Sequence, residues 1–111
     1  MKANEQINRA SKTFSKATVY GYYRVADRSG IKIRPVKFDG WSDGTFEYYA
    51  NEERWHVIDP TTGMSIATGD NRKNARTNAY SKEIQDKFNI WKQTDNYKEQ
   101  CNIWKQMLEE Y

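Results

Sequence analysis

The stretch that decides the fold runs from residue 18 to residue 38 and reads TVYGYYRVADRSGIKIRPVKF. Two runs rich in β-branched and aromatic residues, Thr18–Asp27 and Ile31–Phe38, flank the short segment Arg28-Ser29-Gly30. Such residues favour extended strands, and a short loop that contains glycine lets two strands turn back on each other. The stretch therefore predicts an antiparallel β-hairpin.

A three-residue loop with Gly30 in a left-handed conformation gives this hairpin the register that best separates its two faces. In this register, Arg24 lies opposite Arg34. One face then carries Val19, Tyr23, Val25, Ile31 and Ile33. The other face carries Tyr20, Tyr22, Arg24, Lys32, Arg34, Val36 and Phe38. Two arginines in direct opposition are unfavourable unless an anion lies between them or nearby acids screen them.

Turn residues after the hairpin separate three further strands. These strands are Thr45–Ala50, Arg54–Asp59 and Met64–Thr68. The last two form a second hairpin across Pro60-Thr61-Thr62-Gly63, in which Val57 pairs with Ile66. The strands together predict an antiparallel sheet over residues 18–68. The core side of the second hairpin is expected to carry Trp55, Val57, Met64 and Ile66.

Apolar residues recur at helical spacing in the sequence before and after the predicted sheet. A first helix is expected over residues 4–17, with Arg9, Lys12 and Lys16 on its polar face. Two more helices are expected over residues 70–93 and 96–110. The chain of 111 residues is thus predicted to be a single α+β domain with an N-terminal helix, an antiparallel sheet of about five strands and two C-terminal helices.

The pentapeptide Asn-Ile-Trp-Lys-Gln occurs at residues 89–93 and again at residues 102–106. On one continuous helix the two copies would point about 220° apart, so a break between them is expected. The simpler interpretation is a duplication that supplies core tryptophans. The alternative is a homodimer, in which a second copy of the last helix packs on the stripe formed by Trp104, Leu108 and Tyr111.

The basic side chains are concentrated at the N-terminal end of the chain. Residues 1–38 hold nine of the eighteen lysines and arginines but two of the fifteen acids, so their net charge is +7. Residues 39–111 carry a net charge of −4. A basic surface concentrates anions and steers their approach, so this asymmetry predicts an anionic partner.

The predicted hairpin and the predicted N-terminal helix supply the candidate partner-binding residues. Tyrosines interleaved with arginines can stack bases while the cations hold phosphates. The C-terminal helices could instead cover this face and neutralise the arginines with their acids, and the sequence favours neither alternative. The candidates are Tyr20, Tyr22, Arg24, Lys32, Arg34, Arg9, Lys12 and Lys16.

Catalytic, metal and cofactor sites are not expected. His56 and Cys101 are the single histidine and the single cysteine, and a nucleophile pair needs an orienting group that no motif here supplies. The loop at residues 39–44 lacks the alternating oxygen ligands of a calcium-binding loop. We therefore predict a non-enzymatic protein without metal or cofactor.

The sequence also predicts a cytoplasmic protein that does not enter a membrane. No apolar run is long enough to span a bilayer. The first residues lack the apolar stretch of a signal peptide. A single cysteine fits a reducing compartment.

Residues 55–69, WHVIDPTTGMSIATG, and the following Arg72-Lys73-Asn74-Ala75 resemble a hairpin-then-helix unit of small accessory proteins of phages and mobile elements. Anti-CRISPR proteins belong to that class. The resemblance covers about twenty residues. It implies a non-enzymatic inhibitor that binds a host nuclease or a defence ribonucleoprotein complex in the host-cell cytoplasm. The rival expectation is a small basic protein that binds DNA or RNA directly.

Overall fold

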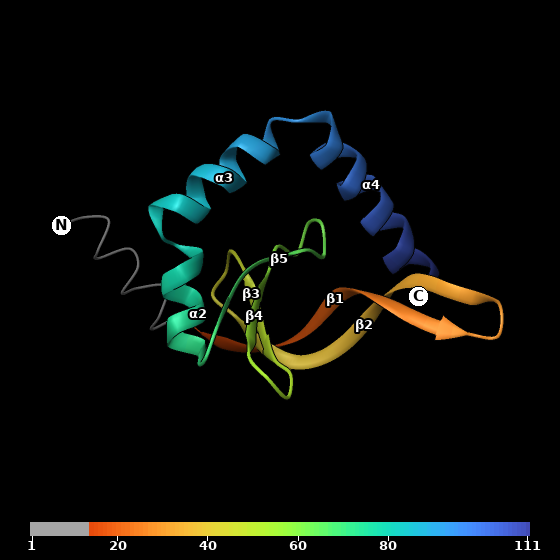
Figure 1. The fold of residues 1–111 in the computed structure, drawn as a ribbon, viewed down its shortest axis with the longest axis horizontal. Coiled ribbons are helices and arrows are strands. Elements are labelled where there is room, and N and C mark those ends of the chain that lie inside the picture. The colour runs from red at the N-terminus through yellow and green to blue at the C-terminus, as the bar shows by residue number, and fades with distance from the viewer. Residues whose placement is uncertain (1–13) are drawn as a thin grey trace.

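The computed structural model describes residues 14–111, which form a five-stranded antiparallel sheet followed by three helices (Figure 1). The strands lie side by side in chain order. They are β1 (Ser15–Asp27), β2 (Gly30–Ser42), β3 (Glu47–Ala50), β4 (Trp55–Ile58) and β5 (Ser65–Gly69). The helices are α2 (Arg72–Ala79), α3 (Lys82–Lys92) and α4 (Asp95–Glu110). The sheet and the α+β class agree with the prediction.

The prediction of a helix over residues 4–17 is wrong for residues 15–17, the part of it that forms a strand in the described structure. Residues 15–17 belong to β1, and Lys16 lies opposite Trp41 of β2. Pairing with β2 outweighs the helical periodicity of this segment, because tertiary contacts override weak local preferences. Residues 4–13 of the expected helix lie outside the described residues.

A single helix over residues 70–93 is also wrong, because the chain forms both α2 and α3 there. Ser81 begins α3, and its hydroxyl accepts a hydrogen bond from the Ile84 N–H at 3.3 Å. A serine at this position satisfies one of the free N–H groups of a helix start, so it favours a new helix over continuation of the old one. α4, capped by Thr94, matches the helix expected over residues 96–110 to within one residue.

The first hairpin has a register one residue away from the predicted one. Asp27 lies opposite Gly30, and Arg24 lies opposite Ile33. Gly30 has the positive φ that the sequence predicts, +116°, but the loop contains two residues and not three. Because side chains alternate along a strand, a shift of one residue exchanges the faces of one strand relative to its partner.

The second hairpin is shifted in the same way. Val57 lies opposite Ala67 and not Ile66, and an irregularity in the pairing follows between Val57 and Ile58. Val57 is buried on the core side as predicted. The other three predicted core residues, Trp55, Met64 and Ile66, are half-buried.

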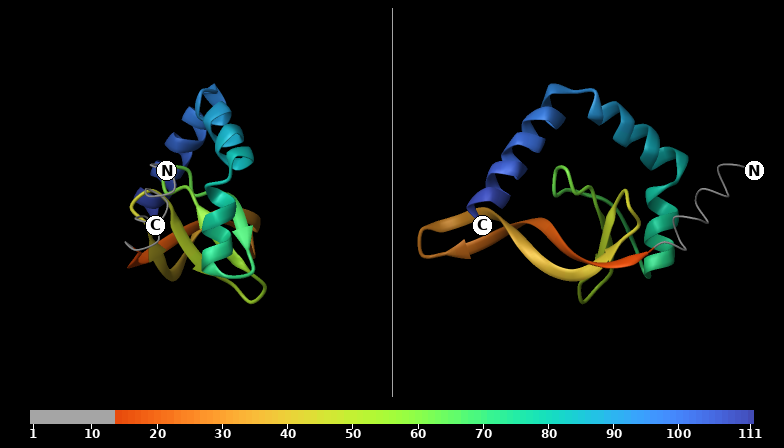
Figure 2. Two further views of the ribbon diagram at one scale, coloured as in Figure 1. Left: turned by 90° about the vertical axis from the view of Figure 1, so that its left-hand side faces the viewer. Right: turned by 180° about the vertical axis from the view of Figure 1, so that it is seen from behind.

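The sheet buries side chains on both of its faces. The face under the helices carries the main core (Figure 2). Its buried members are Phe46, Tyr48, Val57, Ala75, Ala79 and Phe88. On the opposite face Val19 of β1 packs with Tyr49 of β3 and Ile58 of β4. The Tyr22 N–H donates a hydrogen bond to the Gly63 carbonyl at 3.1 Å, which ties β1 to the loop before β5.

A buried aspartate organises the turn between β2 and β3. Asp43 Oδ1 accepts hydrogen bonds from the backbone N–H groups of Thr45 and Phe46. Its Oδ2 accepts the hydroxyls of Tyr48 at 2.7 Å and Tyr80 at 2.9 Å. Four donors satisfy this carboxylate within the fold, so Asp43 has a structural role.

Candidate functional site

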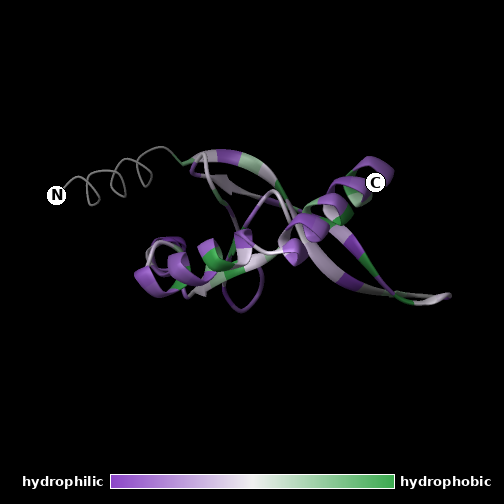
Figure 3. Cartoon of the chain, turned by 90° about the horizontal axis from the view of Figure 1, so that it is seen from above, coloured by the Kyte–Doolittle hydropathy of each residue, from purple (hydrophilic) through white to green (hydrophobic). Residues whose placement is uncertain are grey.

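The outer part of the β1–β2 hairpin, residues 24–34, projects from the body of the molecule, and we call it the arm (Figure 1). Among the described strands, β1 and β2 are each other's only neighbours in the arm. The exposed residues of the arm are Arg24, Ala26 and residues 28–34. Hydrophobic and hydrophilic residues alternate along it (Figure 3). The exposed fraction is 72% for Ile31 and 38% for Ile33.

The arm is strongly basic. Its sequence contains one acid, Asp27, and four cationic residues, which are Arg24, Arg28, Lys32 and Arg34. A two-stranded ribbon is marginally stable in water by itself, and exposed isoleucines leave apolar area in contact with water. Arginines beside exposed apolar side chains are typical of contact surfaces.

The candidate residues of the hairpin do not share one face. Directly opposed residues of an antiparallel pair lie on the same face. Tyr23 lies opposite Arg34, and Arg24 lies opposite Ile33. Lys32 and Arg34 therefore share the face of Tyr23, whereas Arg24 is on the other face with Ile33. The predicted opposition of two arginines is wrong, because the loop is one residue shorter than predicted.

Helix α4 covers the two candidate tyrosines. The ring centroids of Tyr22 and Trp104 are 5.7 Å apart, and those of Tyr20 and Tyr111 are 5.6 Å apart. Both Tyr20 and Tyr22 are half-buried. Of the two alternatives left open by the sequence, coverage by a C-terminal helix is the one found for these tyrosines. The covering groups are aromatic rings and not the acids that the sequence suggested.

The remaining candidates lie at separate places. Lys16 is exposed at the start of β1, and Arg9 and Lys12 lie outside the described residues. Among the self-association candidates, Trp104 is buried within its own chain, with 2% of its surface exposed. Leu108 and Tyr111 have exposed fractions of 36% and 64%.

The arm and the last turn of α4 form a pocket of about 410 Å³, which we call the arm pocket. It is lined by Lys32, Ile33, Arg34, Pro35, Met107, Glu110 and Tyr111. The pocket brings Lys32 and Arg34 of the hairpin together with Tyr111, the last residue of the C-terminal apolar stripe. Sequence reasoning missed it because no local pattern links Ile33 with Met107. Their proximity depends on where α4 ends beside the β1–β2 hairpin, as the right-hand view of Figure 2 shows.

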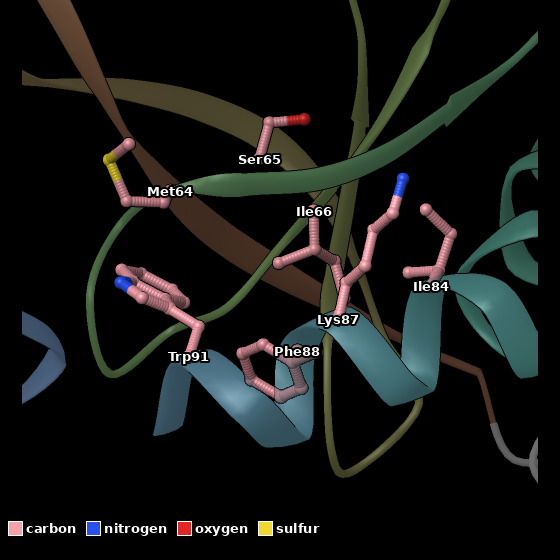
Figure 4. A pocket seen from close by; sticks show the side chains of 7 residues that line it. All are labelled: Met64, Ser65, Ile66, Ile84, Lys87, Phe88 and Trp91. Carbon is pink, nitrogen blue, oxygen red and sulfur yellow. The ribbon is translucent and has the colours of Figure 1, made fainter. Parts of the chain in front are cut away.

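A second pocket, of about 310 Å³, lies between β5 and α3 (Figure 4). It is lined by Met64, Ser65, Ile66, Ile84, Lys87, Phe88 and Trp91. The three apolar residues from α3 are at positions that the sequence assigns to the core, so the helix does not close completely on the sheet. Lys87 forms an ion pair with Glu83 at 3.2 Å.

The two residues considered for a nucleophile pair have other neighbours. His56 forms a hydrogen bond with Asn51 at 2.9 Å and stacks on Tyr49, with 5.1 Å between ring centroids. Burial, and then the charge of Arg54, lower the pKa of His56. Cys101 lies on α4. Within residues 14–111, no three His, Cys, Asp or Glu residues gather in a way that could hold a metal ion.

Comparison of the chain with protein families, with curated proteins and with solved structures finds no match. The assignment of a function therefore rests on the surfaces described above. Within the described part of the chain, no helix combines the length and the apolar character needed to cross a membrane.

Proposed function

We propose that this chain is a non-enzymatic binding protein that uses the arm to contact an acidic groove of a host nuclease or of a defence ribonucleoprotein complex. In this proposal it is a small phage-type inhibitor of the anti-CRISPR kind and acts in the cytoplasm of the host cell. The resemblance of residues 55–75 to accessory proteins of phages and mobile elements supports this class of protein.

The arm is the observation that carries the proposal. It projects from the body of the molecule, so it can enter a groove that the body cannot. Its cations steer it toward an anionic surface and set its orientation there. Ile31 and Ile33 add apolar area, and removing such area from water stabilises a complex by about 25 cal/mol per Å². Charge and apolar area on one projecting element support a contact with another macromolecule.

A second candidate function is direct binding of DNA or RNA. The shape of the arm favours it, because the major groove of B-DNA, about 12 Å wide, admits a two-stranded β-ribbon. The coverage of Tyr20 and Tyr22 by α4 weighs against it. These rings are the groups that the sequence offers for base stacking, and in the structure they pack edge-on or tilted against the rings of Tyr111 and Trp104.

A nuclease-inhibition assay tests the proposal. The full chain is added to a panel of purified RNA-guided nucleases and restriction nucleases, and cleavage of their DNA substrates is measured. We expect inhibition of at least one enzyme, and we expect the double variant Arg24→Gln/Arg34→Gln to weaken it about tenfold or more at low salt. The matched control, Lys98→Gln/Lys105→Gln, removes two exposed cations of α4 and should retain inhibition.

Other outcomes separate the rival functions. Equal inhibition by the arm variant and by the wild type would contradict the arm as the contact element. Inhibition of every nuclease in proportion to binding of the naked substrate, with a steep loss in salt, would favour direct nucleic-acid binding. Absence of inhibition, together with a dimer in light scattering that Leu108→Ser dissociates, would favour self-association through α4.

A further inference from the structure

We infer that the arm pocket receives an apolar side chain of the partner protein, carried on an extended segment rich in acidic residues. This inference rests on the proposed function, because it names the chemistry that the arm recognises. The structure supports it through the walls of the pocket, through the charges beside those walls and through the position of one carboxylate.

The walls of the arm pocket fit an apolar group. Ile33 and Pro35 contribute from β2, Met107 contributes from α4, and Tyr111 contributes from the residue that follows α4. Ile33 and Tyr111 keep exposed fractions of 38% and 64%. The volume of about 410 Å³ lies within the range of roughly 300–1,000 Å³ that is usual for pockets that hold a ligand. An inserted side chain would remove this apolar surface from water, which is the main favourable contribution to most protein association.

The charges around the pocket select acidic neighbours for that side chain. Lys32 and Arg34 also line the pocket, from the face of the arm opposite to that of Ile33, and Arg24 and Arg28 are exposed further along the arm. A segment that places carboxylates on both sides of its apolar residue would meet these cations as the residue enters. Complementary charges of this kind fix the register of an interface and speed its formation.

Glu110 distinguishes a polypeptide from a nucleic acid at this site. Glu110 lines the same pocket as Lys32 and Arg34. A nucleic acid carries a charge at every nucleotide, so it would bring a phosphate close to Glu110. A polypeptide can place an uncharged residue opposite Glu110 and its acids opposite Lys32 and Arg34. The mixed charge of the pocket therefore favours a protein segment as its occupant.

Fluorescence anisotropy with labelled peptides tests the inference on the full chain. One short peptide has a central leucine flanked by aspartates and glutamates, and a second has alanine in place of the leucine. A short DNA duplex and a single strand of the same length serve as anionic probes without an apolar anchor. The protein variants are Met107→Ser, Lys32→Gln and Glu110→Gln. Ile90→Ser and Lys105→Gln are the matched controls, because both residues lie on helices but do not line the pocket.

We expect the leucine peptide to bind about tenfold more tightly than the alanine peptide, as burial of one leucine side chain implies. In Met107→Ser this ratio should fall below about threefold, which shows that the leucine occupies the pocket. Lys32→Gln should weaken and Glu110→Gln should strengthen binding of both peptides by about threefold each. The control variants should bind like the wild type, and circular dichroism should show that every variant unfolds near the wild-type temperature.

Three results would overturn the inference. The first is a leucine-to-alanine ratio that Met107→Ser leaves unchanged. The second is DNA binding tighter than peptide binding, and the third is no binding of any probe. The nuclease assay distinguishes a failure of the inference about the arm pocket from a failure of the proposed function. If Arg24→Gln/Arg34→Gln loses inhibition while Met107→Ser retains it, the arm is the contact element and the pocket is not used.

Discussion

Both the backbone and a neighbouring ring require glycine at position 63. Gly63 has a φ of +71°, and a Cβ added there would lie 2.4 Å from the ring of Trp104. A left-handed backbone costs a non-glycine residue about 1 kcal/mol, and the buried ring has little room to move. We predict that Gly63→Ala lowers the free energy of unfolding by about 3 kcal/mol, as measured by urea denaturation.

Gly44→Ala is the matched control for this substitution. Gly44 has a φ of +91°, but nothing lies within 4 Å of an added Cβ. Its substitution should cost the backbone strain alone, about 1 kcal/mol. Equal losses in the two variants would show that Trp104 does not pack against Gly63.

Buried tyrosines make the fold sensitive to alkali. Burial, and then the carboxylate of Asp59, raise the pKa of Tyr97 to about 12. Burial, and then the hydrogen bond to Asp43, raise the pKa of Tyr48 as well. An unfolded tyrosine ionises near pH 10, so above that pH the unfolded chain releases protons that the folded chain keeps. The stability contributed by these tyrosines is complete below about pH 10 and is lost as the pH rises toward the folded pKa values.

We therefore predict that the melting temperature falls steeply between about pH 10 and pH 12. Circular dichroism at a series of pH values measures it, and tyrosinate absorbance reports the ionisation. Tyr48→Phe should lower the melting temperature at neutral pH, because Asp43 loses a donor, and should make the alkaline slope shallower. A wild-type curve that stays flat over this pH range would contradict the prediction.

At the scale of elements, Trp104 is the buried side chain of α4. Trp104 is buried against Gly63 and Tyr22, whereas Leu108 keeps an exposed fraction of 36%. We predict that Trp104→Ala lowers the free energy of unfolding by about 4 kcal/mol and that Leu108→Ala lowers it by less than about 1 kcal/mol. Urea denaturation measures both values. A large, concentration-dependent loss in Leu108→Ala would show instead that a second copy of the chain buries this residue.

The elements that the sequence predicted well are those fixed by neighbours along the chain. Along β3 and the residue before it, alternation alone separates Phe46 and Tyr48, which lie in the main core, from Tyr49 on the opposite face. The helix start at Ser81 also has a local cause, since its hydroxyl caps α3. A serine N-cap at residue 81 is therefore a local signal for a break in the helix predicted over residues 70–93.

The registers of the hairpins were not predictable from local pattern. Arg28-Ser29-Gly30 is compatible with a loop of two or three residues, and the pattern of side chains favours three, whereas the observed register pairs Val25 with Lys32 and Arg24 with Ile33. The choice depends on distant packing, because Val19 must meet Tyr49 and Ile58 across the curled sheet. The predicted register groups Ile31 with Val19, although Ile31 lies past the edge of the core and keeps an exposed fraction of 72%.

At the scale of the whole molecule, the fold satisfies its buried acids without an ion. Asp43 accepts four hydrogen bonds, and Asp59 accepts the hydroxyls of Thr62 and Tyr97 at 3.0 and 3.2 Å. We predict that EDTA leaves the melting temperature unchanged, as measured by differential scanning calorimetry. A fall of several degrees that added calcium or zinc reverses would reveal a metal site and overturn this prediction.

Charge asymmetry predicted the region of the candidate site but not its composition. Four of the nine basic residues of the N-terminal part lie in the arm, as the pattern of charge indicates. The arm pocket also includes Met107, Glu110 and Tyr111. Their position beside the arm depends on the break between α3 and α4 and on the curvature of the sheet, so composition and residue spacing do not predict it.

The arm has one further consequence, for its amide hydrogens. Its two strands are paired with each other, and no other described strand pairs with their outer edges, so opening the ribbon breaks few backbone hydrogen bonds. The opening free energy should therefore be far below that of global unfolding. Amides of the arm should exchange with deuterium quickly, while those beside Val19 and Val57 exchange only when the whole chain unfolds. A bound partner would slow deuterium exchange of the arm amides first. Exchange in the arm would therefore reveal binding of a partner in the unmodified protein.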